Sequence, residues 1–190
     1  MKAVFALAIS LSLFAGNFSE AMVVYDESLS GDLASDFTSP TPLSYSTGEN
    51  TVIGQFGANG DGGVVFGPSG NDVDRFTFTV PAGAQIISLT VDAFVASDDI
   101  GFGSLIAYVD ASAFASDTDN VSNILFNAGS GEILPSLAGG PLGPGDYSFW
   151  LQETALSTID YQLTFTQIMP EPSALGLVSI LVAGLIRQRR

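Results

Sequence analysis

The stretch RFTFTVPAGAQIISLTVDAF, residues 75–94, contains two runs of alternating apolar and polar side chains separated by a turn signal. In the first run, Phe76, Phe78 and Val80 share one face, and the turn residues Pro81–Gly83 follow. The second run places four residues on one face: Ile87, Leu89, Val91 and Ala93. A period of two is typical of a strand with one buried side, so the stretch predicts two strands joined by a short turn.

The same alternation recurs near the end of the chain, in DYSFWLQE (146–153) and IDYQLTFTQ (159–167). Shorter apolar runs predict four further strands, at 23–25, 51–56, 64–66 and 104–109. About eight strands without a helical stripe favour an all-β fold, a jelly-roll-like β-sandwich. Residues 111–144 have few strand patterns and are expected to form long loops on one rim.

Composition excludes several kinds of site. The chain has 190 residues, enough for one domain, with no cysteine and no histidine. These absences exclude a disulfide framework, a Ser-His-Asp triad and an imidazole-bound zinc ion. The chain has 20 acidic residues and only five basic ones. Because such a surface repels phosphate groups, nucleic acid is excluded as a partner. Paired carboxylates leave a glycosidase as the remaining catalytic hypothesis, and no catalytic or cofactor-binding residue is assigned.

The first 21 residues have the pattern of a secretory signal peptide. Lys2 precedes an apolar run, residues 4–15, and Ser19 and Ala21 are the small residues that signal peptidase prefers. We predict cleavage after Ala21, with a buried N-terminal helix as the alternative. The β-sandwich domain is then expected to span residues 22–168.

The last 22 residues, 169–190, form a second distinct segment. Pro170, Glu171 and Pro172 precede an apolar stretch at 174–186 and a terminal arginine cluster: Arg187, Arg189 and Arg190. Thirteen helical residues rise about 20 Å, less than the roughly 30 Å of a bilayer core. The arginines favour retention of the end on the cytoplasmic side. The segment therefore predicts a short transmembrane helix with a transient inner-membrane association; a permanent tail anchor is the alternative.

This order of Pro-Glu-Pro, short apolar helix and arginine cluster closely resembles the PEP-CTERM sorting signal of Gram-negative bacteria. The resemblance implies that Pro170, Glu171 and Pro172 are recognised by exosortase, a membrane-embedded transpeptidase-like protease. It also implies delivery to the cell surface or extracellular matrix in a bacterium that makes exopolysaccharide.

A second resemblance covers about half of the chain. Residues 70–91 (GNDVDRFTFTVPAGAQIISLTV), 143–154 (GPGDYSFWLQET) and 160–166 (DYQLTFT) resemble the bacterial pre-peptidase C-terminal domain. Its marks are an Asp-x-Asp before an aromatic strand, here Asp72 and Asp74, and a Pro-x-Gly turn. Arg75 stands where the family more often has an aromatic residue. This resemblance implies a β-sandwich of the kind appended to secreted peptidases and found in surface proteins.

Two groups of residues are candidate ligand contacts. Asp72, Asp74 and the NGDGG segment at 59–63 supply hard oxygen atoms suited to calcium, although acidic residues of this kind also serve simply as turn formers. Trp150 faces away from Tyr147, Phe149 and Leu151 and could present an aromatic platform to a sugar. The alternative for Trp150 is packing beneath a rim loop.

Together these patterns predict an exported, non-enzymatic cell-surface or extracellular-matrix protein associated with exopolysaccharide. Signal peptidase and exosortase are its expected processing enzymes. One alternative is a carbohydrate-binding module for self-made exopolysaccharide, using Trp150 and the rim loops, and the other is the carboxylate-based glycosidase.

Overall fold

A computed structural model describes residues 21–58, 71–97, 104–116, 118–154 and 157–169. These residues form nine strands and two short helices. The elements are β1 (Met22–Asp26), α1 (Glu27–Ser30), β2 (Thr41–Pro42), β3 (Gly48–Ala58), β4 (Asn71–Val80), β5 (Gln85–Ala96), β6 (Ser104–Val109), β7 (Ser122–Phe126), α2 (Leu134–Ala138), β8 (Gly145–Gln152) and β9 (Thr158–Ile168). The predicted all-β fold is confirmed.

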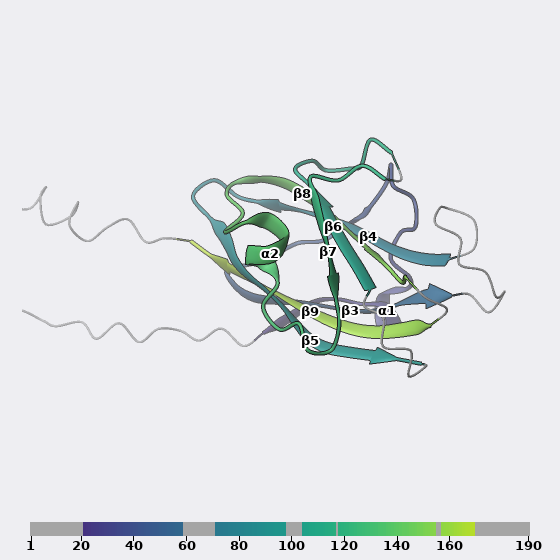
Figure 1. Cartoon of the computed structure of the whole chain (residues 1–190). Coiled ribbons are helices and arrows are strands. Elements are labelled where there is room, and N and C mark those ends of the chain that lie inside the picture. The colour runs from purple at the N-terminus through teal and green to yellow at the C-terminus, as the bar shows by residue number, and fades with distance from the viewer. Residues whose placement is uncertain (1–20, 59–70, 98–103, 117, 155–156, 170–190) are drawn as a thin grey trace, which may run out of the picture.

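The strands form one curled sheet that doubles back into two layers (Figure 1). Its strand order is β5-β9-β3-β4-β8-β6-β7, with β1 added in parallel to β3 and β2 in parallel to β4. Strand β4 joins the layers, because Asn71 and Asp72 pair with β3 whereas residues 73–80 pair with β8. The two layers of the predicted sandwich are therefore joined through β4, at the end where residues 71 and 72 lie.

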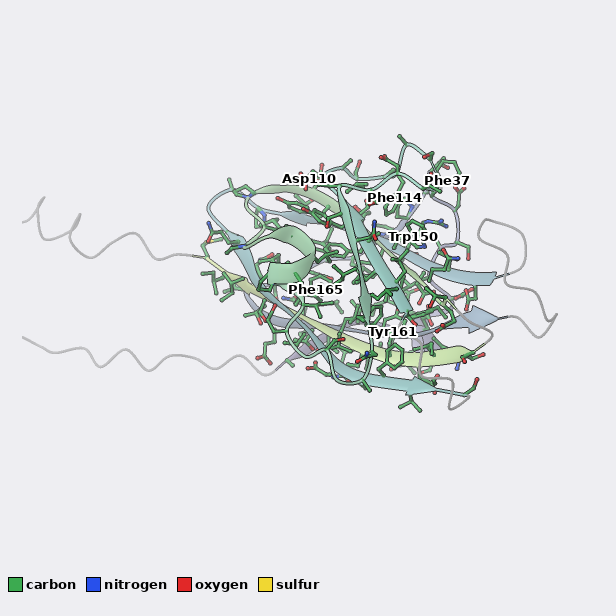
Figure 2. All side chains as sticks on the ribbon, viewed as in Figure 1. Phe37, Asp110, Phe114, Trp150, Tyr161 and Phe165 are labelled. Carbon is green, nitrogen blue, oxygen red and sulfur yellow. The ribbon has the colours of Figure 1, made fainter. Side chains whose placement is uncertain are left out.

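Aromatic side chains fill the space between the layers. The ring of Phe149 on β8 lies 5.7 Å from that of Phe76 and 5.5 Å from that of Phe78. Across the interior, the Phe149 ring lies 5.2 Å from that of Phe165 on β9. Figure 2 shows Tyr161 and Phe165 between the layers. The inward faces predicted for residues 75–80, 146–153 and 159–167 are confirmed.

Strand β5 departs from simple alternation at two places. Its register against β9 shifts between Ile86 and Ser88 and again between Val91 and Ala93, where one extra residue enters the strand. Each shift reverses the side on which the following residues lie. Ile86 is consequently buried and Ile87 exposed, so the inward position predicted for Ile87 is wrong, as is that of the exposed Ala93.

Residues 111–144 are more ordered than predicted. They contain β7, which pairs with β6, and α2, whose Leu134 and Leu137 are buried in the core. Figure 1 shows α2 against the opening between the layers. The carboxylate of Glu132 accepts hydrogen bonds from the backbone amides of Leu89 (3.1 Å) and Leu134 (2.9 Å). The bond from Leu89 fastens the segment to β5, so the expectation of long loops is wrong for the parts of this stretch that form β7 and α2.

The predicted strand at 64–66, the signal segment before Ala21 and the tail from Pro170 onward lie outside the described residues. Among the residues that the structure describes, no helix has the length and apolar character needed to cross a membrane.

Candidate metal centre

Three carboxylates from separate parts of the chain converge at one end of the sandwich. Glu27 begins α1, Asp32 follows that helix, and Asp74 lies on β4. One oxygen of each lies within 4.8 Å of the others. Two oxygens bound to the same calcium ion at 2.3–2.6 Å can be at most about 5 Å apart, so a single ion could contact all three side chains.

The local fold of residues 26–33 brings Glu27 and Asp32 together. Asp26 caps α1 by accepting a hydrogen bond from the backbone amide of Ser28 at 2.9 Å. Gly31, with φ of 91°, ends the helix after one turn and donates to the carbonyl of Glu27. The buried side chain of Leu33 then holds the returning chain against the core. Asp32 is consequently placed beside Glu27.

Backbone groups fix the carboxylate of Glu27. Its Oε1 accepts a hydrogen bond from the amide of Leu33 at 2.9 Å, and its Oε2 accepts one from the amide of Gln55 at 2.6 Å. Gly54 leaves room for this arrangement. A Cβ atom there would lie 2.6 Å from the Tyr161 hydroxyl oxygen and 2.9 Å from Cδ of Glu27, so glycine is required at this position.

Asp74 is the most unusual member of the cluster. Its side chain has no exposed surface, and neither oxygen has a hydrogen-bond partner among the described residues. Burial and the charge of Glu27 raise the pKa of Asp74 well above its usual range, although the neighbouring Tyr161 hydroxyl acts in the opposite direction. A buried carboxylate without a partner is costly, and a bound cation would supply the missing interaction.

Asp72 lies two residues earlier on the same side of β4. Burial, together with the charges of Asp32 and Glu27, raises the pKa of Asp72 to about 7. Burial also raises the pKa of Glu27. Four carboxyl groups thus occupy one region, and the raised pKa of three of them means that their charged forms are disfavoured there in the absence of positive charge.

Sequence analysis identified two of these four carboxylates. It named Asp72 and Asp74 as candidate ligands but missed Glu27 and Asp32, which no local spacing connects to β4. Both Asp72 and Asp74 lie within a strand, so the turn-forming alternative does not apply to them. Part of a signal was present, because alternation places these aspartates on the same face as Phe76, which is a buried face. The NGDGG segment lies outside the described residues.

Trp150 does not form the predicted sugar platform. Only 7% of its surface is exposed, because it packs with Val73, Val109 and Phe114 on the outer side of its layer. Figure 2 shows Phe37 and Phe114 close to it, away from the main core. The Arg75 guanidinium, itself buried, lies 5.4 Å from the centre of the Trp150 ring. Packing beneath a loop, the alternative stated above, is what the structure shows.

The predicted sorting residues lie outside the described part of the chain: Pro170, Glu171, Pro172, Arg187, Arg189 and Arg190. Ala21, the predicted cleavage position, is the first described residue and is exposed.

No protein-family model matches the chain, and no curated protein matches it either. Among solved structures, the pre-peptidase C-terminal domain of a collagenase from Bacillus anthracis is similar, at 16% sequence identity and a TM-score of 0.36. The alignment covers 67% of this chain and 92% of that domain. Similarity at this level assigns neither a function nor a site residue.

The raised pKa values predict how the cation-free protein responds to pH. The folded state binds protons at Asp72 and Asp74 more tightly than the unfolded state, so stability falls as pH rises above about 4, the usual pKa of aspartate. For Asp72 the fall extends to about pH 7. We expect the melting temperature in metal-free buffer to decrease between pH 5 and 8, measured by circular dichroism.

Asp110→Asn, at an exposed residue on another part of the surface, is the control for this pH dependence (Figure 2). The decrease should be smaller in Asp72→Asn than in Asp110→Asn. An equal decrease in the two variants would show that general acidic repulsion causes it.

Proposed function

We propose that this protein is an exported, non-enzymatic cell-surface or extracellular-matrix protein whose sandwich is completed by a calcium ion held by Glu27, Asp32 and Asp74, with Asp72 beside them. The observation that carries the calcium site is Asp74: it is fully buried, both of its oxygens lack partners, and it faces two other carboxylates.

The donor set favours calcium over other common ions. All three side chains offer carboxylate oxygens, which hard cations prefer, whereas zinc sites use mainly cysteine and histidine, which this chain lacks. Magnesium requires near-octahedral geometry and usually keeps several water molecules, which suits a fully buried ligand such as Asp74 less well. Calcium accepts irregular arrangements of six to eight oxygens.

The same geometry argues against the glycosidase alternative. A glycosidase needs two carboxyl groups on either side of an accessible sugar bond. Asp74 has no exposed surface and therefore cannot reach a substrate. Its raised pKa is explained by burial beside other acids, and a structural ion accounts for the whole cluster.

Export is supported by the two ends of the sequence. The signal pattern before Ala21 and the PEP-CTERM-like tail from Pro170 to Arg190 predict secretion followed by tail removal by exosortase. Association with exopolysaccharide belongs to the same proposal. Intact-mass analysis of protein released from the producing cells tests processing: we expect a species that lacks Arg190, and a surface species that retains Arg190 would contradict removal of the tail.

Thermal melting of the full chain tests the calcium site. At calcium concentrations about a hundred times the dissociation constant, binding stabilises the folded state by about 2.7 kcal/mol, a rise of roughly 5–10 °C for a domain of this size. The comparison is a melt in calcium against one in excess chelator at pH 7.5. Coincident midpoints in the two buffers would reject the site.

A further inference from the structure

A pocket of about 690 Å³ opens directly beside the candidate metal centre. Glu27, Asp32 and Asp72 are among the residues that line it, whereas Asp74 has no exposed surface and is not one of them. Since an ion of calcium's size occupies only a small part of such a volume, the pocket has room for a further ligand in contact with the ion.

The number of protein ligands leaves coordination positions on the ion. The three carboxylates supply three to six oxygens, and Glu27 already accepts one backbone hydrogen bond at each of its oxygens. Calcium takes six to eight oxygens, so even a six-oxygen shell made by the protein alone would need every carboxylate to bind through both oxygens, which these bonds restrict. Because Asp74 closes the buried side, the open positions face the pocket.

Other residues that line the pocket combine hydrogen-bonding and apolar groups, and they belong to β3, β5 and β9. Gln55, Asp160 and Gln162 supply amide and carboxylate groups, and Ala93 and Val95 supply an exposed apolar surface. Gln55 Nε2 donates to an oxygen of Asp160 at 2.5 Å, which holds both side chains in place. A sugar ring presents the same mixture, hydroxyl groups at its edge and C–H groups on its face.

Charge narrows the class of ligand. No basic side chain is among the described residues that line the pocket, whereas five acidic ones are: Asp26, Glu27, Asp32, Asp72 and Asp160. Even with a divalent ion bound, the site remains negative, so an anionic sugar such as a uronate would be repelled. An amine would compete with the ion for the same carboxylates. A neutral polyol can instead donate hydrogen bonds to the acids and coordinate the ion through its oxygens.

We propose that this pocket binds a neutral, hydroxyl-rich sugar, two adjacent hydroxyl groups of which complete the coordination of the calcium ion. This inference rests on the proposed calcium site. It places sugar recognition on the outer face of β3, β5 and β9 and the α1 segment, on a different surface from that of Trp150.

Terbium luminescence tests the two steps separately. Terbium replaces calcium and is excited through nearby tyrosines, and Tyr161 itself lines the pocket. Its lifetimes in H₂O and D₂O count the bound water molecules. We expect luminescence when the full chain binds terbium, and a loss of about two bound waters when a neutral sugar coordinates through two hydroxyls. The probes are the methyl glycosides of mannose, galactose, glucose and fucose, followed by an array of neutral glycans in calcium or chelator.

Ala93→Phe is the variant that separates sugar binding from ion binding. Ala93 is exposed on β5 and lines the pocket, and it is not a proposed ligand of the ion. We expect at least a tenfold loss of sugar affinity with unchanged terbium affinity. Ile87→Phe, on the same strand and exposed but not among the pocket-lining residues, is the matched control and should change neither.

Each outcome is decisive for one of the two proposals. Terbium binding without calcium-dependent retention of any neutral glycan would overturn the sugar proposal and leave the calcium site intact. Glycan binding that persists in chelator, or that survives Ala93→Phe, would also overturn it. Retention of only amine-bearing glycans would overturn it too, because a cationic group would then be binding to the carboxylates in place of a neutral sugar. Failure to bind terbium or calcium at all would reject the metal site itself.

Discussion

Replacing Asp74 with asparagine should raise the melting temperature of the cation-free protein and abolish the rise that calcium produces. Asparagine has the same shape but carries no charge, so the cost of a buried carboxylate without a partner disappears. The same change removes a negative ligand from the ion. We expect the calcium-dependent increase of roughly 5–10 °C to fall to near zero, measured by thermal melts at pH 7.5 with calcium and with chelator.

The opposite signs of these two effects distinguish a metal site from a structural acid. Asp110→Asn is the control, since it removes one charge from an exposed position and should preserve the full calcium response. If Asp74→Asn instead lowered the cation-free melting temperature and still responded to calcium, Asp74 would have a structural role with no connection to an ion.

Replacing Phe149 with alanine should cost about 3–5 kcal/mol of unfolding free energy, a large share of the roughly 5–15 kcal/mol that a domain of this size possesses. Phe149 is fully buried and contacts rings on both layers. Its loss would leave a cavity at the point where β8 meets β9. Urea denaturation in saturating calcium measures the cost without changing the occupancy of the metal site.

Leu125→Ala is the matched large-to-small control. Leu125 lies on the edge strand β7 and is 65% exposed, so its truncation should change the unfolding free energy by less than about 0.5 kcal/mol. Similar losses in the two variants would contradict the position of Phe149 at the centre of the core.

Alternation along the sequence predicted the strands with one buried face, because the period of two directly reports which side chains face the core. The run from Arg75 to Val80 and the runs around Phe149 and Phe165 are confirmed on this ground. The buried face of β5 was harder to predict, because its sequence alternates regularly while its two bulges move side chains to the other face of the sheet. A bulge depends on pairing with β9, and pairing between distant strands is absent from a local pattern.

The candidate metal centre could likewise be predicted only where it depends on local sequence, and not where it depends on contacts between distant segments. Asp74 stands in an alternating run, so its location on the apolar face could be predicted. Glu27 reaches it only because β1 pairs in parallel with β3, a contact between segments that the sequence does not connect. Trp150 was placed on the correct face, but nothing local indicated that Phe37 and Phe114 would cover it.

Strand β9 lies in the middle of its layer, between β3 and β5, yet it is the last along the chain of the strands that the structure describes. Thr51 and Thr164, which share a hydrogen bond between their hydroxyl groups, are 113 residues apart. Until β9 arrives, the edges of β3 and β5 that it occupies expose backbone groups without partners, and such edges favour aggregation. A growing chain therefore cannot close this layer until β9 has been synthesised, and the edges that β9 will occupy stay open to other strands until then.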